Sequence, residues 1–339
     1  MRRVPGIVAA PRQFLHCQTG ATADTAQAMQ RLSLASGIPA ELRGSIVALG
    51  NFDGFHLGHQ AVVGRAVARG HHERRPVIVA TFDPHPVRFF KPYLPPFRLT
   101  SLDQRESLFA HAGADAMLVF DFNAELAATS AEDFVALLGD TIGAAGVVTG
   151  GDFTFGRGRA GNAEVLRELG QQRGIAAEAV HAIALDGEPV SSSRIRSALE
   201  EGDPGTATHL LSRPFAVQGV VEQGDRRGRE LGYPTANLGL GDYQRPKYGI
   251  YAVRVTLPDG SEHAGVASLG VRPTFQPRTE WLEAFLFDWD GDLYGQTIEV
   301  ALHHYLRPEA KFDSAEALVA AMDDDAMRAR DLLGAPTDR

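Results

Sequence analysis

Short apolar runs alternate with helix-type patterns from about residue 45 to residue 211. The runs rich in Val, Ile and Ala predict buried strands, and the segments between them predict amphipathic helices. This alternation predicts an α/β fold with parallel strands, right-handed crossovers and ligands at the carboxyl ends of the strands. The predicted strands are 46–49, 77–81, 116–120, 146–149 and 175–180, and the predicted helices include 57–68, 103–111, 131–138 and 163–173.

The pattern changes after Ser212, where successive β-type segments follow one another without helices between them. The turn sequences Pro258-Asp259-Gly260 and Asp290-Gly291 predict hairpins, and the whole predicts an antiparallel sheet or small barrel. A helix over 314–333 closes the chain. The predicted strands are 215–221, 249–256, 264–269, 280–287 and 297–305.

These two patterns predict two domains with separate cores, which a chain of 339 residues is long enough to build. We place the first domain at 30–211 and the second at 212–339, after an N-terminal extension over 1–29 that has no stable fold of its own. The extension contains arginines and one acid, Asp24. A transit peptide has that composition, but we favour a poorly ordered tail or an upstream start codon, because Met29 directly precedes the first domain.

The composition is that of an ordinary globular protein, with 44% hydrophobic and 22% charged residues. A net charge of −9 argues against nonspecific binding of nucleic acid, which needs a basic face. The single cysteine, Cys17, excludes an internal disulfide framework. No apolar stretch approaches the roughly 20 residues that span a bilayer. The sequence leaves open whether the protein forms a weak homo-oligomer.

The segment with the clearest chemistry is the glycine-rich turn from Gly50 to His59, which follows the first predicted strand. Its glycines allow the backbone to approach a phosphate closely, and the amides of the next helix point at that phosphate. His56 and His59 can donate hydrogen bonds to phosphate oxygens where charge builds during displacement at phosphorus. The segment therefore predicts phosphate chemistry rather than a structural pair of histidines.

His56-Leu57-Gly58-His59 resembles the HxGH signature of the nucleotidyltransferases, which transfer a nucleoside monophosphate from a triphosphate and release pyrophosphate. The resemblance implies that the histidines stabilise the transition state without a covalent enzyme intermediate. By itself the motif leaves the acceptor open. Pantetheine phosphate, nicotinamide mononucleotide, cholinephosphate and FMN all remain candidates.

A second motif lies in the glycine-rich segment 224–237, which ends in Tyr233-Pro234-Thr235-Ala236-Asn237. Thr235 and Asn237 are two residues apart, so in an extended segment they face the same side. A hydroxyl and an amide oxygen are hard ligands suited to Mg²⁺, which keeps phosphate oxygens as further partners. The preceding glycines, Gly228 and Gly232 among them, can wrap backbone amides around nucleotide phosphates.

Pro234-Thr235-Ala236-Asn237 resembles the corresponding motif of riboflavin kinases. With the HxGH motif, the chain from about Gln30 to Leu333 resembles the bacterial bifunctional riboflavin kinase/FMN adenylyltransferases, also called FAD synthetases. The resemblance implies a Rossmann-like adenylyltransferase domain followed by a small β-barrel kinase domain, in a cytoplasmic enzyme. The implied reactions use ATP and Mg²⁺: riboflavin gives FMN and ADP, and FMN gives FAD and pyrophosphate.

The same resemblance assigns roles in the first domain. Asp152, in Gly151-Asp152-Phe153, is the implied nucleotide contact, and Arg196, in the run from Ser191 to Arg196, is the implied phosphate ligand, a task that suits its rigid guanidinium. Ser193 stands where the family has threonine and is also the predicted N-cap of a helix. The further implied contacts are Gly50, Phe52, Asp53, Gly54 and Ser192 for the nucleotide, and Phe82 and Asp83 for the flavin.

In the second domain the resemblance implies nucleotide contacts at Gly228 and Gly232, a flavin contact at Arg272 and a catalytic base at Glu283. In a strand Glu283 faces away from its immediate neighbours, Leu282 and Ala284. It could take the proton from the ribityl hydroxyl as this attacks the γ-phosphate. Glu280 is the nearest competitor, on the opposite strand face.

Two rival hypotheses are weaker. A monofunctional enzyme with one inactive domain would not need both sets of residues, namely His56, His59 and Arg196 with Thr235, Asn237 and Glu283. A noncatalytic flavin-binding module would need neither a base nor metal ligands. Ala284 replaces a histidine that many members carry, which affects packing or flavin contact but removes no predicted catalytic group.

Overall fold

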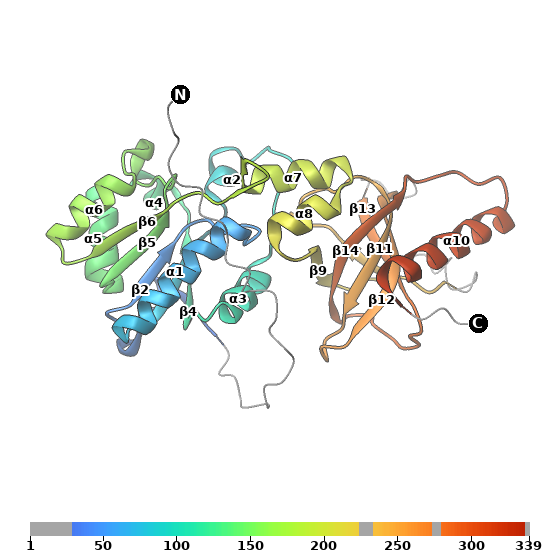
Figure 1. The fold of residues 1–339 in the computed structure, drawn as a ribbon, viewed down its shortest axis with the longest axis horizontal. Helices are drawn as coiled ribbons and strands as arrows, with labels where there is room; N and C mark the ends of the chain where they lie inside the picture. The colour runs from blue at the N-terminus through green and yellow to red at the C-terminus, as the bar shows by residue number, and fades with distance from the viewer. Residues whose placement is uncertain (1–28, 224–232, 273–278, 336–339) are drawn as a thin grey trace, which may run out of the picture.

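The computed structural model describes residues 29–223, 233–272 and 279–335, without the side chains of Arg272 and Thr279. Two sheets lie side by side, the N-terminal one in blue and green and the C-terminal one in orange (Figure 1). The first is parallel throughout and the second is antiparallel. The fold class predicted from the sequence is therefore confirmed.

The parallel sheet has the strand order β1-β4-β3-β2-β5-β6. Five of its strands were predicted, and the sixth, β1, is a short edge strand in which only Leu32 is buried. One buried residue in four gives too weak a pattern to predict. The strands are β1 (Gln30–Ser33), β2 (Ile46–Leu49), β3 (Val77–Asp83), β4 (Ala116–Asp121), β5 (Gly146–Gly150) and β6 (Ala176–Val180).

Helices cover both faces of this sheet because its strands are apolar on both sides. Ile46 and Ala48 of β2 pack in a cluster with residues of α1 (Leu57–Glu73) and α3 (Leu102–His111). Val47 and Leu49 point to the other face, where α5 (Ala131–Ala136) and α6 (Ala163–Gln172) cover them. The remaining helices of this half are η2 (Ala40–Leu42), α2 (Pro86–Phe90), α4 (Ala124–Ala128), the π-helical turn η3 (Leu137–Ile142) and η4 (Arg157–Arg159).

The strand order creates a switch point at β2. The chain moves from β2 to β3 and β4 on one side and then returns to β5 on the other. Ligands of doubly wound sheets bind at such a point, outside the carboxyl ends of the strands. The turn that begins at Gly50 leaves the end of β2, and the loop with Asp152 leaves the end of the neighbouring β5.

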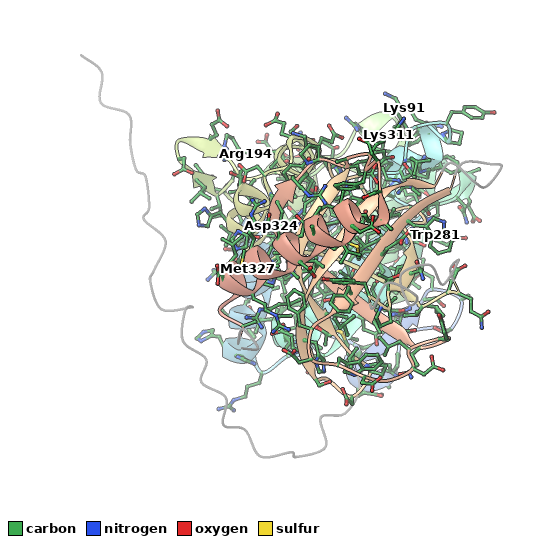
Figure 2. All side chains as sticks on the ribbon, turned by 90° about the vertical axis from the view of Figure 1, so that its right-hand side faces the viewer. Lys91, Arg194, Trp281, Lys311, Asp324 and Met327 are labelled. Carbon is green, nitrogen blue, oxygen red and sulfur yellow. The ribbon has the colours of Figure 1, made fainter. Side chains whose placement is uncertain are left out.

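The C-terminal half is a six-stranded antiparallel barrel with the order β10-β13-β12-β11-β14-β9. A bridge between Glu222 and Asn237 brings its two edge strands together. Helix α10 (Ala315–Leu333) lies across the barrel with Asp324 and Met327 on its outer side (Figure 2). The strands are β9 (Phe215–Val220), β10 (Ala236–Gly239), β11 (Gly249–Thr256), β12 (Glu262–Arg272), β13 (Thr279–Leu286) and β14 (Thr297–Arg307).

One of the two predicted hairpins is wrong. The turn at Pro258-Asp259-Gly260 joins β11 and β12, which pair antiparallel as predicted. The turn at Asp290-Gly291 joins β13 and β14, but β13 pairs with β12 and β10, whereas β14 pairs with β11 and β9. Turn residues specify where a chain reverses, but long-range packing decides which strands become neighbours.

The parallel sheet and the barrel each pack around hydrophobic clusters of their own, but the end of the predicted first domain packs with the barrel. Helices α7 (Ser192–Glu201) and α8 (Pro204–Leu211) lie between the sheets (Figure 1). Their buried residues Ile195 and Leu210 share one hydrophobic cluster with Val217 and Leu238 of the barrel. The short strands β7 (Ala184–Leu185) and β8 (Glu188–Pro189) precede α7 as a two-stranded hairpin.

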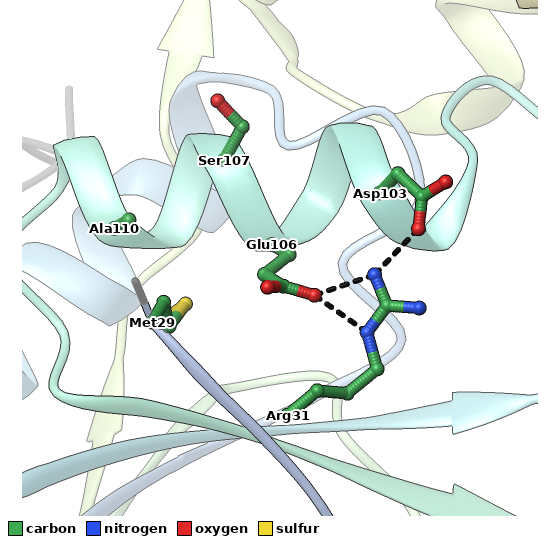
Figure 3. Close-up of a pocket in the computed structure, with 6 residues that line it drawn as sticks. All are labelled: Met29, Arg31, Asp103, Glu106, Ser107 and Ala110. Carbon is green, nitrogen blue, oxygen red and sulfur yellow. Dashed lines mark hydrogen bonds and ion pairs between the residues drawn. The ribbon is translucent and has the colours of Figure 1, made fainter. Parts of the chain in front are cut away.

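A shallow pocket lies between β1 and α3, at the edge of the parallel sheet (Figure 3). Arg31 on β1 donates to Asp103 at 2.6 Å and to Glu106 at 2.5 Å, so its guanidinium joins the edge strand to α3. Met29, the first described residue, lines the same pocket. None of the candidate site residues lies here.

A chain that begins at Met29 should keep both activities predicted from the motifs. It retains β1 and the Arg31 ion pairs, and residues 1–28 contain no segment that resembles a site. Flavin turnover and thermal melting of the purified full-length and shortened proteins test this expectation. A large loss of either turnover or melting temperature in the shortened protein would refute it.

Candidate active sites

The turn after β2 has an unusual backbone. Phe52, Gly54 and Phe55 have φ values of +50°, +85° and +44°. Only glycine adopts such angles without strain, so the two phenylalanines must be held by their surroundings. The Phe52 side chain is buried and its ring meets the edges of the His59 and Phe109 rings. A nucleotide contact at Phe52 can therefore come only from its backbone.

Both motif histidines lie where the turn becomes α1. His56 is the N-cap residue, and its Nδ1 accepts from the amides of Gly58 at 3.2 Å and His59 at 3.4 Å. The two imidazole rings stack with their centroids 3.6 Å apart. Nδ1 of His59 is buried without a hydrogen-bond partner in the described part of the chain. The helix start thus fixes the orientation of the first ring, and stacking aligns the second with it.

Both histidines are neutral near pH 7. Burial lowers the pKa of His56 to about 4, against a smaller opposite effect of the Asp53 carboxylate. Burial also lowers the pKa of His59 well below the ordinary value, and the neighbouring His56 adds to this. Because Nδ1 of His56 is an acceptor, we assign its proton to Nε2, which is then the donor available to a ligand.

The buried histidines should make stability depend on pH. Burial lowers the pKa of His56 and of His85 to about 4, whereas a histidine in the unfolded chain has a pKa near 6.5. The unfolded chain therefore binds more protons between these values, and the free energy of unfolding should fall as pH drops from about 6.5 to about 4. Above pH 7 these histidines are neutral in the folded and in the unfolded chain, so they should not make the free energy of unfolding depend on pH.

Urea unfolding at a series of pH values measures this dependence on pH. His85→Asn is the matched variant, because His85 caps α2 by accepting from the amide of Val87 and asparagine can do the same without titrating. We expect a shallower decline in this variant. A wild-type midpoint that stays constant from pH 7 to pH 5 would contradict the prediction.

Asp53 and Arg196 form the charged anchor of this site. The Asp53 side chain is buried, and its Oδ2 accepts from Arg196 at 2.6 Å. Its Oδ1 accepts from the amides of Leu99 at 2.9 Å and Thr100 at 3.0 Å. Arg196 also donates through Nε to the carbonyl of Phe97 at 2.7 Å. These contacts set the direction of the guanidinium before any ligand arrives.

The run of three serines meets the same turn. Ser192 Oγ donates to the carbonyl of Asp53 at 2.9 Å, which places this predicted nucleotide-binding residue against the turn. The predicted N-cap, Ser193, is wrong by two residues. Ser191 has extended backbone and its side chain accepts from the amide of Arg194, so it is Ser191 that caps α7.

The predicted contacts on β3 and in the loop after β5 have different surroundings. Asp152 is exposed, and its charge acts on His56, so it lies near the histidines as expected. Phe82 is buried and stacks on Phe120, which makes it a core residue rather than an open flavin platform. Asp83 pairs with Arg98 at 3.2 Å at the edge of the site.

Arg105 is a buried cation that the motifs did not reveal. Its side chain in α3 lies under the turn and donates to Oγ1 of Thr81 at 3.0 Å and to the carbonyl of Asn51 at 3.4 Å. Burial lowers the pKa of its guanidinium, which nevertheless stays charged. It adds positive charge beneath a site that would receive phosphates. A single arginine in an amphipathic helix gives no sequence signal for this role.

In the barrel, strand pairing brings Asn237, and with it the neighbouring Thr235, to Glu283, which the spacing along the chain did not predict. Asn237 of β10 stands directly opposite Glu283 of β13. Leu238, Leu282 and Ala284 point into the barrel and are buried, so Asn237 and Glu283 share the other face. Ala284 therefore affects barrel packing rather than a flavin contact.

The donor set fits a hard cation. Nδ2 of Asn237 donates to the carbonyl of Thr235 at 3.2 Å, which turns the amide so that Oδ1 is its ligand-type atom. No group of three histidine, cysteine or acidic side chains that could hold a metal occurs in the parts of the chain described by the structure. Thr235 and Asn237 could therefore hold Mg²⁺ only together with oxygens of a bound nucleotide.

Two other glutamates bear on the assignment of the base, and one of them, Glu309, lies near Glu283. Glu309 was not predicted, and its carboxylate packs so closely against Gly270 that a side chain at this glycine would clash with it. Burial, and then the charge of Glu283, raises the pKa of Glu309. Glu280, the competitor for the base, is held by Arg245 at 2.5 Å and by the Tyr248 hydroxyl. The predicted contacts Gly228 and Gly232 and the side chain of Arg272 lie outside the described residues.

Comparison with known proteins agrees with these two sites. Residues 38–194 match the family model of FAD synthetase, and residues 211–333 match that of riboflavin kinase. The bifunctional riboflavin kinase/FMN adenylyltransferase of Pseudomonas fluorescens is 40% identical over 88% of this chain and 95% of its own. The chain belongs to this bifunctional family. The enzyme phosphorylates riboflavin to FMN and adenylylates FMN to FAD, with ATP as the co-substrate of both reactions.

Other relatives have the same two-part organisation. The bifunctional enzymes of Escherichia coli and Bacillus subtilis are 35% and 33% identical, over 87% and 86% of this chain and 95% and 93% of their own. The crystal structure of a macrolide-efflux protein from Streptococcus pneumoniae is 30% identical, with a TM-score of 0.80 over 89% of this chain and 99% of its own.

Among the described residues, no helix has the length and apolar character to cross a membrane.

Proposed function

We propose that the turn after β2 carries out adenylyl transfer with the residues found there. Arg196 binds phosphate oxygens of ATP, and the backbone of Gly50, Asp53 and Gly54 lies against the nucleotide. Neutral His56 donates from Nε2 to the oxygens that gain charge as FMN attacks the α-phosphate, and His59 supports it from the stacked position. The buried Asp53–Arg196 pair at 2.6 Å carries this proposal most directly, because it orients a phosphate-binding group beside the motif histidines.

We propose that phosphorylation of riboflavin takes place at the outer face of β10 and β13. Glu283 accepts the proton of the ribityl hydroxyl, while Thr235 and Asn237 hold Mg²⁺, which neutralises charge on the ATP phosphates. The opposition of Asn237 and Glu283 in the strand register supports this arrangement. We place the enzyme in the cytoplasm, where flavin and ATP would be available as substrates for these reactions.

One assay tests both proposed sites. Purified enzyme with riboflavin and Mg-ATP should form FMN and then FAD, which chromatography separates. A module that binds flavin without turnover would leave riboflavin unchanged, and an enzyme with an inactive first site would stop at FMN. The two rival hypotheses are thereby distinguished from the proposed function.

The metal assignment gives a sharper expectation. Thr235→Val keeps the shape of the side chain and removes its hydroxyl, so the Mg²⁺ concentration for half-maximal FMN formation should rise about tenfold, the equivalent of one lost ligand at roughly 1.4 kcal/mol. Adenylylation of supplied FMN should keep its Mg²⁺ dependence. Titration of Mg²⁺ at constant free ATP measures both. An unchanged requirement for FMN formation would remove Thr235 from the metal site.

A further inference from the structure

The turn that carries the adenylyl-transfer residues is held from the kinase half of the chain. Arg213 follows α8 and lies within the region that matches riboflavin kinase, 211–333. Its guanidinium donates to the carbonyl of Gly54 at 2.9 Å and to that of Phe55 at 3.4 Å. These two carbonyls belong to the turn immediately before His56. The matched FAD synthetase region, 38–194, does not include this arginine.

The turn needs such support because two of its residues other than glycine, Phe52 and Phe55, have positive φ. Strained backbone persists only where neighbouring groups over-determine it. On one side Thr100 accepts from the amide of Gly54 at 2.9 Å through Oγ1. On the other side Arg213 holds the carbonyls, and Gln60 donates to the Phe55 carbonyl at 2.9 Å. The fork of the guanidinium spans two successive carbonyls, which no monodentate side chain can do.

The segment that carries Thr100 is itself attached to the barrel. The amide of Arg98 donates to the carbonyl of Asp242 at 2.9 Å, and the amide of Gln244 donates to the carbonyl of Arg98 at 2.7 Å. The next two amides, of Leu99 and Thr100, hold Asp53. Both sides of the turn are thus tied to the kinase half, through Arg98 on one side and Arg213 on the other.

We propose that Arg213 is a positioning residue for adenylyl transfer. It holds the carbonyls of Gly54 and Phe55, and this keeps the Nε2 donor of His56 directed at the reacting phosphate. The inference rests on the proposed role of His56. Among the described residues, the hydrogen bonds of Arg213 reach the carbonyls of Gly54, Phe55 and Leu211 and none of the proposed kinase residues. A shift of about 1 Å in a catalytic group can cost on the order of 100-fold in rate, so a relaxed turn should lower turnover of FMN to FAD.

A purely structural role is the alternative. Arg213 also donates to the carbonyl of Leu211 at 3.3 Å, at the end of α8, so it could merely cap a helix. Arg254 provides a matched control, because it donates to the carbonyl of Leu333 at the end of α10, at 2.8 Å. That contact also caps a helix but lies away from the turn.

The test compares Arg213→Gln, Arg213→Lys and Arg254→Gln in the full chain, with FAD formation from supplied FMN and FMN formation from riboflavin as separate assays. In Arg213→Gln we expect kcat for FAD formation to fall about 10- to 100-fold, with the KM values for FMN and ATP, the kinase rate and the melting temperature close to wild type. Arg213→Lys keeps the charge but loses the forked geometry, so its kcat for FAD formation should lie between those of the wild type and Arg213→Gln. Arg254→Gln should keep both rates.

A double-mutant cycle separates this inference from the proposed function. If Arg213 acts through His56, Arg213→Gln should add little to the loss caused by His56→Asn. Full FAD formation by His56→Asn alone would overturn the proposed role of His56. A low rate in His56→Asn with a wild-type rate in Arg213→Gln would overturn only the positioning role. Equal losses of FAD formation, FMN formation and melting temperature in Arg213→Gln and Arg213→Lys would also overturn it, in favour of the structural role.

Discussion

Glu283→Gln should nearly abolish the formation of FMN from riboflavin. Glutamine keeps the size of the side chain and its place opposite Asn237 but cannot accept the proton of the ribityl hydroxyl. General-base catalysis contributes roughly 10²- to 10⁴-fold, and the loose transition state of phosphoryl transfer puts the expected loss towards the lower end. FMN supplied directly should still be adenylylated at close to the wild-type rate, because that reaction uses the other site.

Glu280→Gln is the control for this substitution. Glu280 is three residues away on the same strand and accepts from Arg245 and Tyr248. The two donors use different carboxylate oxygens, so glutamine can keep accepting from Arg245 through its single oxygen while its amide nitrogen faces the Tyr248 hydroxyl, which can accept from it. Both reactions should therefore remain largely intact, with a drop in melting temperature from the lost charge. Normal kinase activity in Glu283→Gln together with a loss in Glu280→Gln would move the base to Glu280.

Replacing both motif histidines by alanine should abolish FAD formation while FMN still accumulates from riboflavin. The loss of a single donor to a developing charge costs about 10²- to 10³-fold in rate. The kinase residues lie on strands of the barrel, away from α1, so their reaction should continue. Assays of FMN and FAD over time, starting from riboflavin, measure both effects at once.

His56→Asn makes the same test without removing the helix cap. His56 caps α1, and an alanine at such a position costs about 1 kcal/mol, whereas asparagine is a preferred N-cap. The asparagine should therefore preserve the start of α1 but withdraw the Nε2 donor. We expect the loss of FAD formation to remain while the melting temperature is kept. A simultaneous collapse of FMN formation would show that the two reactions cannot be separated by these residues.

The family resemblance and the strand periodicity together predicted the candidate residues of both sites. Spacing predicts that Thr235 and Asn237 share one side and that Glu283 faces away from its immediate neighbours, because alternation along a strand is a local property. The position of Asn237 opposite Glu283 depends on the pairing of β10 with β13, which spacing does not encode. His56 and His59 occupy the end of β2, as expected for a doubly wound sheet. Their roles in the reactions remain predictions.

Other features followed only from tertiary structure. Phe82 looked like a flavin contact but is buried against Phe120, because packing between strand and helix decides which aromatic rings remain open. The neighbours of β14 and the cluster shared by α7, α8 and the barrel depend on contacts between residues far apart in the chain. Nothing in the local pattern around the Asp290-Gly291 turn records them.

The sequence by itself determined most of the elements, their order and the chemistry of the two motifs, since hydrophobic period, turn residues and motif spacing are local. The tertiary structure decided what surrounds the motifs: the partners of Asp53, the buried charge of Arg105 and the hold of Arg213 on the turn before His56. A lone arginine between Ser212 and Pro214 carries no pattern. Its contact with Gly54 spans 159 residues of sequence and exists only once both halves have folded against each other.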